Sequence, residues 1–329
     1  MSDIAAQPAL HRMIHAQADA VERMAEIDLT APAEKLAGAR RVFLVGTGTS
    51  RHAAELGVMM LADAGVDARW ASAAQFARWG TRLSPDDAVV VITHTAETAF
   101  ALRCREQVLA AGARLVSLTG IGSGWPDAIE TVEREQSETY TVSYTAALAV
   151  LAGLAHRLGA AQYGPQELRR TAAAVRAAYE ETAVHRIALP ARVLAVIGAG
   201  PWAVTAREGA LKIREASRTL AEGFEAEHYL HGSAVPFGTA DGLLLLEPAA
   251  DPDGLVAALG AAAEQEGIAV STLRAPEGGL PPVLAQLPMT VRLQLLAARF
   301  ADVRQQNPDV AIVGAWAEQE LWTLGAPTG

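Results

Sequence analysis

Short apolar runs alternate with helically patterned stretches through most of the chain. Continuously apolar runs at 42–46, 66–71, 89–93 and 114–118 predict strands, and the periodicity between them predicts helices at 50–64 and 97–111. Strands that are apolar throughout and separated by helices indicate a parallel sheet covered on both faces.

The same pattern begins again about 150 residues later, as expected of an internal duplication. R-V-L-A-V-I-G-A-G at 192–200 repeats R-V-F-L-V-G-T-G at 41–48, and it is followed by predicted strands at 242–246 and 268–271 and a helix at 290–303. We therefore expect an α/β protein with two tandem doubly wound, flavodoxin-like parallel-sheet domains. The expected limits are a helical segment at 1–36, domains at 37–160 and 188–305, a linking helix at 161–187 and a tail at 306–329.

The regions outside the two sheets are also patterned. Apolar residues at helical spacing predict one amphipathic helix over 7–27, interrupted only by Gln17. Two long helices are predicted at 141–158 and 166–184. The tail combines a turn with a partly apolar segment at 310–324.

Composition narrows the class of protein. Hydrophobic residues make up 51% and charged residues 19% of the chain, which is typical of a globular protein. The net charge of −10 argues against a nucleic-acid partner, which needs basic patches. The beginning of the sequence has no signal-peptide pattern, and no charge-free apolar run is long enough to span a membrane, so we expect a cytoplasmic protein. Cys104 is the single cysteine and is expected to be a buried, inert thiol.

One helix combines charges in a way that suggests acid–base chemistry. Glu208, Lys212 and Glu215 share a face nearly opposite the apolar stripe that ends at Leu220. One interpretation is a solvated face whose ion pairs contribute a few tenths of a kcal/mol each. The other is a carboxylate whose pKa is tuned by the neighbouring lysine, with His231 on a following turn moving a second proton.

Two hydroxyl-rich turns are candidates for binding an anion. Thr47-Gly48-Thr49-Ser50 and Thr93-His94-Thr95-Ala96-Glu97-Thr98 each leave a predicted strand and enter a helix. Their hydroxyls could simply cap the helices, at about 1 kcal/mol each. Together, at the carboxyl ends of adjacent parallel strands, they would line the crevice where open α/β sheets bind ligands.

A dinucleotide fingerprint is the competing interpretation of the glycine turns, and we consider it weak. The first turn has Arg51 in place of the third glycine. The second places Pro201 and Trp202 where the pyrophosphate would approach. No spacing of His, Cys, Asp or Glu suggests a metal site, so we expect neither cofactor nor metal.

These motifs together resemble the sugar isomerase (SIS) family, and most closely the isomerase half of the glucosamine-6-phosphate synthases. The matching segments are T-G-T-S, T-H-T-A-E-T, A-L-K-I-R-E at 210–215, A-E-G-F-E at 221–225 and L-H-G at 230–232. Glu215 and His231 lie sixteen residues apart, as in that family. The resemblance extends from about residue 7 to residue 308.

The resemblance implies roles for particular residues. Binding of the sugar phosphate falls to Thr49, Ser50, Thr93, His94, Thr95 and Thr98. Glu215 would move a proton between C1 and C2, Lys212 would orient Glu215 or hold a sugar hydroxyl, and His231 would open the ring. In the synthases the matching histidine comes from the other subunit, so a homodimer is implied.

The sequence also departs from the family pattern. His94 replaces a glutamine and could donate to the phosphate and make binding pH-dependent; Ala96 replaces a glycine. No lysine follows Lys212, so the family's tail lysine has no counterpart. The expected function is aldose–ketose isomerisation or deamination of a hexose or hexosamine 6-phosphate. The alternative is a non-catalytic sensor that binds a phosphorylated sugar or amino sugar.

Overall fold

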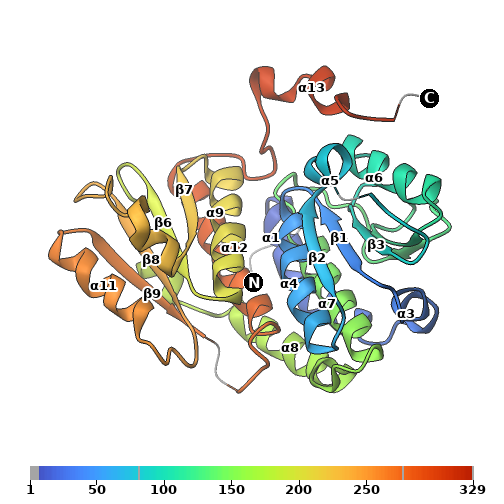
Figure 1. The fold of residues 1–329 in the computed structure, drawn as a ribbon. Coiled ribbons are helices and arrows are strands. Elements are labelled where there is room, and N and C mark those ends of the chain that lie inside the picture. Colours follow the sequence, from blue (N-terminus) through green and yellow to red (C-terminus); the bar gives the residue numbers. More distant parts are fainter. Residues whose placement is uncertain (1–6, 81, 276–277, 328–329) are drawn as a thin grey trace. The chain divides into compact units, whose positions relative to one another are not determined.

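The computed structural model describes residues 7–80, 82–275 and 278–327, and the chain divides into two compact units (Figure 1). The β1–β5 unit comprises Asp19–Glu135, Val142–Arg169 and Ile312–Gly329, and the β6–β9 unit comprises Met1–Ala18, Gln136–Thr141 and Arg170–Ala311. Each unit is thus assembled from separate stretches, and the contiguous limits expected from the sequence stay predictions. Residues 1–6 of the expected N-terminal segment lie outside the described residues.

The β1–β5 unit is built on a five-stranded parallel sheet with the order β2-β1-β3-β4-β5. The strands are β1 Val42–Gly46, β2 Ala68–Ser72, β3 Ala88–Ile92, β4 Arg114–Thr119 and β5 Ala128–Glu130. Helices α4 (Thr49–Asp63), α7 (Val142–Arg157) and α3 (Thr30–Leu36) lie on one face, and α5 (Ala73–Trp79) and α6 (Ala99–Ala110) on the other. Strands β1 and β3 are buried along their whole length because both faces are covered, which explains their unbroken apolar sequence.

The β6–β9 unit repeats this arrangement around a four-stranded parallel sheet with the order β7-β6-β8-β9. The strands are β6 Leu194–Gly198, β7 Ala221–Glu225, β8 Gly242–Glu247 and β9 Ala269–Arg274. Helices α9 (Pro201–Ser217) and α12 (Gln286–Val303) cover one face, and α11 (Leu255–Gln265) covers the other. The prediction of an α/β fold with two parallel sheets is confirmed.

The two sheets also agree in the detail of their first turns. Gly48 precedes α4 with φ 56° and ψ −127°, and Gly200 precedes α9 with φ 55° and ψ −127°. Only glycine adopts this region readily. The shared conformation and strand order support the proposal that the units are tandem copies.

The N-terminal helix differs from the prediction, because the expected single helix is interrupted at Ala16. The structure has α1 (Ala9–His15) and α2 (Gln17–Met24). The Ala16 amide is shared between the carbonyls of Arg12 and Met13, and the Gln17 side chain takes the Ile14 carbonyl, so the helical ladder is broken there. Gln17 is buried and also donates to Gln294 on α12 at 2.6 Å, which accounts for a polar residue in an apolar stripe.

Three further predictions about elements were wrong. Strand β7 was not expected: α9 ends at Ser217, and Leu220 is exposed rather than part of the apolar face of α9. The helix expected at 166–184 ends as α8 (Pro165–Ala178), before a separate 3₁₀ turn at Ala183–Arg186. Gly223, which looked like a break in the pattern, lies inside β7. A Cβ there would lie 2.3 Å from the Arg207 amide nitrogen, so the strand can pack against α9 only with glycine at this position.

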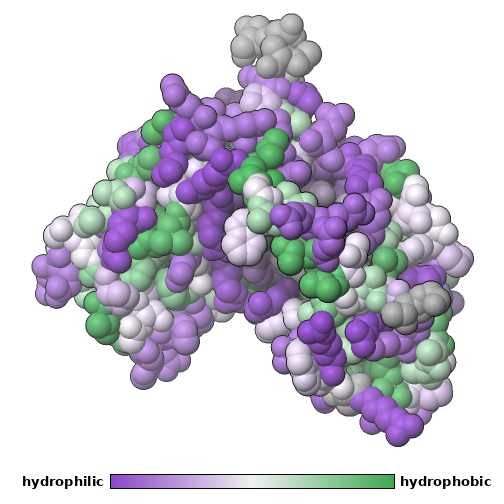
Figure 2. Space-filling model, turned by 90° about the horizontal axis from the view of Figure 1, so that it is seen from above, coloured by the Kyte–Doolittle hydropathy of each residue, from purple (hydrophilic) through white to green (hydrophobic). Residues whose placement is uncertain are grey.

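The surface and the one thiol complete the description of the fold. The face seen in Figure 2 is mostly hydrophilic, with apolar side chains in separate patches. None of the helices in the described ranges has the length and apolar character needed to cross a membrane.

Cys104 is fully buried and donates to the Ala73 carbonyl, and burial raises its pKa to about 12, so the thiol is unreactive as expected.

Candidate functional site

The turn after β1 places a glycine, not a hydroxyl residue, at the start of the helix. Gly48 is the N-cap of α4 and has no side chain with which to cap it. The Ser50 amide donates to the Thr47 carbonyl at 3.1 Å within the turn. Thr49 and Ser50 are half-buried on the first turn of α4, one and two residues after the N-cap, and their role in binding stays a prediction.

The loop after β3 has a similar design. Thr98 is the N-cap of α6, yet its side chain makes no capping hydrogen bond. The Thr95 hydroxyl accepts from the Glu97 amide at 3.2 Å, which shapes the loop and leaves its proton available to donate. Strands β1 and β3 are neighbours, with Val45 opposite Val91, so both turns emerge at the same edge of the sheet. We call the two turns, 47–50 and 93–98, the phosphate cradle.

Ala96 occupies a conformation that normally belongs to glycine. Its φ is 57°, in the left-handed region, which costs a residue with a Cβ about 1–2 kcal/mol. The position is the one where the SIS motif has glycine. The backbone of this loop therefore keeps the glycine-type turn although the sequence has lost the glycine.

His94 is fixed by the backbone on two sides. Its Nε2 accepts a hydrogen bond from the Glu135 amide at 3.1 Å, and its carbonyl accepts from the Gly120 amide at 2.8 Å. Burial lowers the pKa of the imidazole, Glu135 partly raises it, and Arg134 lowers it. The ring is therefore neutral near pH 7, and Nε2 is an acceptor rather than the phosphate donor that the sequence suggested.

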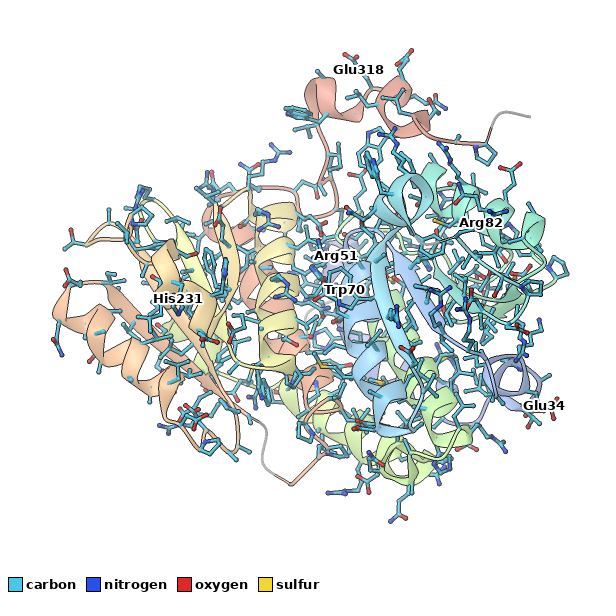
Figure 3. The ribbon with its side chains drawn as sticks, viewed as in Figure 1. Glu34, Arg51, Trp70, Arg82, His231 and Glu318 are labelled. Atoms are coloured by element: carbon cyan, nitrogen blue, oxygen red, sulfur yellow. The ribbon has the colours of Figure 1, made fainter. Side chains whose placement is uncertain are left out.

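Arg51 places a guanidinium on the same first turn of α4 that carries Thr49 and Ser50. Its Nε donates to the buried Glu55 carboxylate at 3.1 Å, and its Cζ lies 4.8 Å from the centre of the Trp70 ring (Figure 3). A guanidinium held by a carboxylate and a tryptophan face is well ordered. Sequence reasoning considered Arg51 only as an argument against dinucleotide binding.

The charged residues of α9 do not form a solvated face. Lys212 and Glu208 have no exposed surface, and Glu215 keeps 20% of its side chain exposed. The Lys212 Nζ lies 2.6 Å from Oε2 of Glu215 and 3.6 Å from Oε1 of Glu208. The interpretation of this face as solvent-exposed is wrong, because α9 is buried on nearly all sides.

The carboxyl group of Glu215 has a shifted pKa. Burial raises the pKa of Glu215; Lys212 opposes the shift by charge and hydrogen bond, Glu208 adds to it, and Arg214 lowers it slightly. The result is a carboxyl group that keeps some solvent access and takes up a proton more readily than an ordinary glutamate. A carboxyl group of this kind is suited both to accept and to return a proton.

His231 differs from the buried residues of α9 because it is exposed to solvent. It lies in the turn Tyr229–Ser233, where its own backbone (φ −82°, ψ 51°) is not helical, and 74% of its side chain is exposed (Figure 3). Its Nε2 is 3.9 Å from the Glu227 carboxylate, too long for a hydrogen bond. A role in ring opening therefore stays a prediction that needs a partner surface.

The equivalent turn of the β6–β9 unit has the same backbone but different chemistry. There Pro201 and Trp202 replace Thr49 and Ser50, so one amide donor and two hydroxyls are missing. Trp202 is buried, where it packs rather than faces a ligand. Of these two equivalent turns, the one before α4 therefore has the hydroxyls expected of a phosphate cradle, and the one before α9 does not. Within the described part of the chain, no group of three potential ligands could hold a metal ion.

Comparisons with known proteins bear on the family resemblance and the fold. The family model described as SIS domain matches residues 35–157. An isomerizing glutamine–fructose-6-phosphate aminotransferase from Listeria monocytogenes is 27% identical in an alignment 264 residues long, which covers 71% of this chain and 42% of that protein. This chain therefore spans less than half the length of that curated relative.

Solved structures extend the likeness to nearly the whole chain. Tagatose-6-phosphate ketose/aldose isomerase from Escherichia coli has a TM-score of 0.80 at 16% identity and covers 96% of this chain and 99% of its own. Glucosamine-6-phosphate deaminase from Thermotoga maritima has a TM-score of 0.75 at 18% identity, covering 92% and 96%. At these identities the likeness concerns the fold. The predicted resemblance to the SIS family is confirmed, and the part of the chain that the SIS domain model matches is residues 35–157.

Proposed function

We propose that this protein binds a phosphorylated sugar or amino sugar and moves a proton between its C1 and C2. The observation that carries the proposal is the cluster in which a fully buried Lys212 lies between Glu208 and Glu215. Burying a lysine between carboxylates contributes little to stability, since desolvation offsets the attraction. A buried, pKa-shifted carboxyl of this kind is more typical of an active site.

The chemistry follows from the residues on α9. Once the sugar ring is open, Glu215 takes the proton from C2 of an aldose and returns it to C1 of the enediol, which gives the ketose. Burial raises the pKa of Glu215, which favours the return of the proton to the sugar. Lys212 holds Glu215 in place and offers a positive charge to the enediolate oxygen. In an amino sugar the same transfer gives an imine at C2, which water hydrolyses with release of ammonia.

The phosphate cradle supplies the second half of the proposal. The uncapped first turns of α4 and α6 carry backbone N–H groups and a partial positive charge. Thr49, Ser50, Thr93, Thr95 and Thr98 add hydroxyl donors around them. We propose that these groups bind the phosphate and that a homodimer in the cytoplasm is the active form.

One observation favours a second candidate, a sugar-phosphate sensor without catalysis. His231 is exposed and has no hydrogen bond within the described residues, so the expected ring-opening group is not engaged with the Glu215 cluster. A sensor would use the cradle alone.

A panel of hexose and hexosamine 6-phosphates distinguishes the candidates. Aldose–ketose exchange and ammonia release are followed in parallel, with binding measured by calorimetry. An isomerase or deaminase turns over at least one member of the panel, and a sensor binds one without turnover. Absence of binding to every member would contradict both.

A further inference from the structure

His94 joins the loop 93–98 to two other segments of the β1–β5 unit. Its carbonyl accepts from the amide of Gly120, in the loop after β4. Its ring nitrogen Nε2 accepts from the amide of Glu135, in the segment before α7. These bonds connect residues far apart in sequence, so the loop cannot shift without breaking one of them.

The partner of His94 is itself fixed. The buried Glu135 carboxylate accepts from the Ser143 amide at 2.8 Å, on the first turn of α7. A carboxylate at a helix N-terminus is stabilised by the helix dipole. The first turn of α7 therefore holds Glu135 in place, and the Glu135 amide in turn fixes the orientation of the His94 imidazole.

Gly120 leaves room for the His94 ring. A Cβ at Gly120 would lie 2.8 Å from Cε1 and 2.9 Å from Nδ1 of His94. These distances are shorter than normal contacts, so the ring packs directly against the backbone of Gly120. The loop also contains Ala96 at φ 57°, a strained conformation that persists only where surrounding contacts impose it.

We propose that His94 is a positioning residue: its neutral imidazole, with Nε2 as acceptor, holds the loop 93–98 in the conformation that binds the phosphate of a sugar phosphate. The inference rests on the proposed function for its ligand. It assigns His94 a role through the loop rather than a contact with phosphate. Protonation of Nε2 would replace its lone pair with a donor facing the Glu135 N–H, so the bond would be lost.

Two charged side chains affect the pKa of the His94 ring. Glu135 faces it from the segment before α7 and raises its pKa, and Arg134 from the same segment lowers it. Arg134 forms a two-pronged pair with Glu97 of the loop, at 2.8 and 2.9 Å. Burial remains the largest influence and favours the neutral ring.

Two variants test the acceptor directly. His94→Gln places a neutral acceptor near the position of Nε2, and His94→Leu fills similar space without one. With fructose 6-phosphate and glucosamine 6-phosphate as probes at pH 8, we expect His94→Gln to bind within about threefold of the wild type and His94→Leu to bind about 5- to 100-fold more weakly. Hydrogen exchange of the Glu135 amide should stay slow in His94→Gln and become fast in His94→Leu. Tight binding by His94→Leu, or equal losses in both variants, would overturn the proposal.

The pH dependence separates positioning from simple packing. The ratio of dissociation constants between wild type and His94→Gln cancels the ionisation of the ligand at each pH. This ratio should change only where ¹⁵N resonances show His94 becoming protonated, and should stay constant where they show a neutral ring. Unchanged binding with a protonated ring, or a changed ratio with a neutral one, would contradict it. If no panel member binds the wild type, the proposed function fails, whereas the exchange rate of Glu135 still reports whether His94 holds the loop.

Discussion

The Nζ of Lys212, a residue with no exposed surface, lies 2.6 Å from Oε2 of Glu215. The same ammonium group is 3.6 Å from Glu208, which is also fully buried. Helix spacing alone brings three such residues together. Burial increases both the attraction between their charges and the free-energy cost of removing them from water.

Removing the cation should destabilise the β6–β9 unit. Lys212→Met leaves two carboxylates close together without this cation, and the loss of one partner of a buried pair costs about 3–5 kcal/mol. Urea unfolding monitored by circular dichroism measures the effect. The double variant Lys212→Met/Glu208→Gln should recover part of the loss. A Lys212→Met protein as stable as the wild type would show that the cluster is not held by this charge.

The cradle hydroxyls should matter for phosphorylated ligands only. Ser50→Ala/Thr98→Ala should weaken fructose 6-phosphate binding by about 1.5–3 kcal/mol for each hydrogen bond to the charged phosphate, and leave fructose unaffected. Ser72→Ala is the matched control, since Ser72 caps α5 by accepting from the Gln75 amide at 3.3 Å. The control should lose about 1 kcal/mol of stability and no affinity. Equal loss of fructose and fructose 6-phosphate would point to a purely structural role.

The exposure of His231 leads to a prediction about assembly. If His231 completes a site in another copy of the chain, inactive Glu215→Gln and His231→Asn variants should regain activity when mixed. The recovery arises because a hybrid dimer contains one site with both native groups. Native mass spectrometry verifies that subunits exchange. Exchange without any recovery of turnover would argue that both groups act within one chain.

Ala96→Gly should stabilise the protein although it removes a methyl group. Relief of the left-handed conformation contributes about 1–2 kcal/mol, and the greater freedom of glycine in the unfolded chain offsets about 0.4–1 kcal/mol of it. Thermal unfolding should therefore move upward by a few degrees. Ala101→Gly, inside α6, is the control and should lower the stability by about 1 kcal/mol.

The elements that can be predicted from the sequence are those with a recognisable local pattern of side chains. The apolar runs of β1 and β3 identify buried strands, and the two glycine turns locate the carboxyl ends of β1 and β6. Strand β7 escaped prediction because A-E-G-F-E has no strand pattern of its own. It is defined by pairing with β6 and by the close approach of α9 at Gly223.

The candidate site was likewise predictable only in part. The hydroxyls of the cradle and the carboxylate of Glu215 follow from local motifs. The burial of Lys212 does not, since a lysine three residues from a glutamate looks like an ordinary surface pair. The bond between His94 and Glu135 joins residues that are 41 positions apart, and no local spacing signals it.

Glu215→Gln tests the proposed chemistry most directly, because it keeps the shape of the side chain and removes the base. Proton exchange at C2 of a bound sugar phosphate should slow by about 10²–10⁴-fold in deuterated water, while affinity changes little, since the cradle lies on other residues. The pKa of Glu215 is raised in the folded protein, so this group's contribution to stability is present below the ordinary glutamate pKa and is lost as the pH rises through the raised value. The stability of Glu215→Gln relative to the wild type should accordingly increase from pH 4 to pH 8. The acid limb of the wild-type rate profile should lie above the ordinary glutamate pKa, because the base must be ionised to act. Exchange at the wild-type rate in Glu215→Gln would remove this residue from the mechanism, even if the stability follows the expected pH dependence.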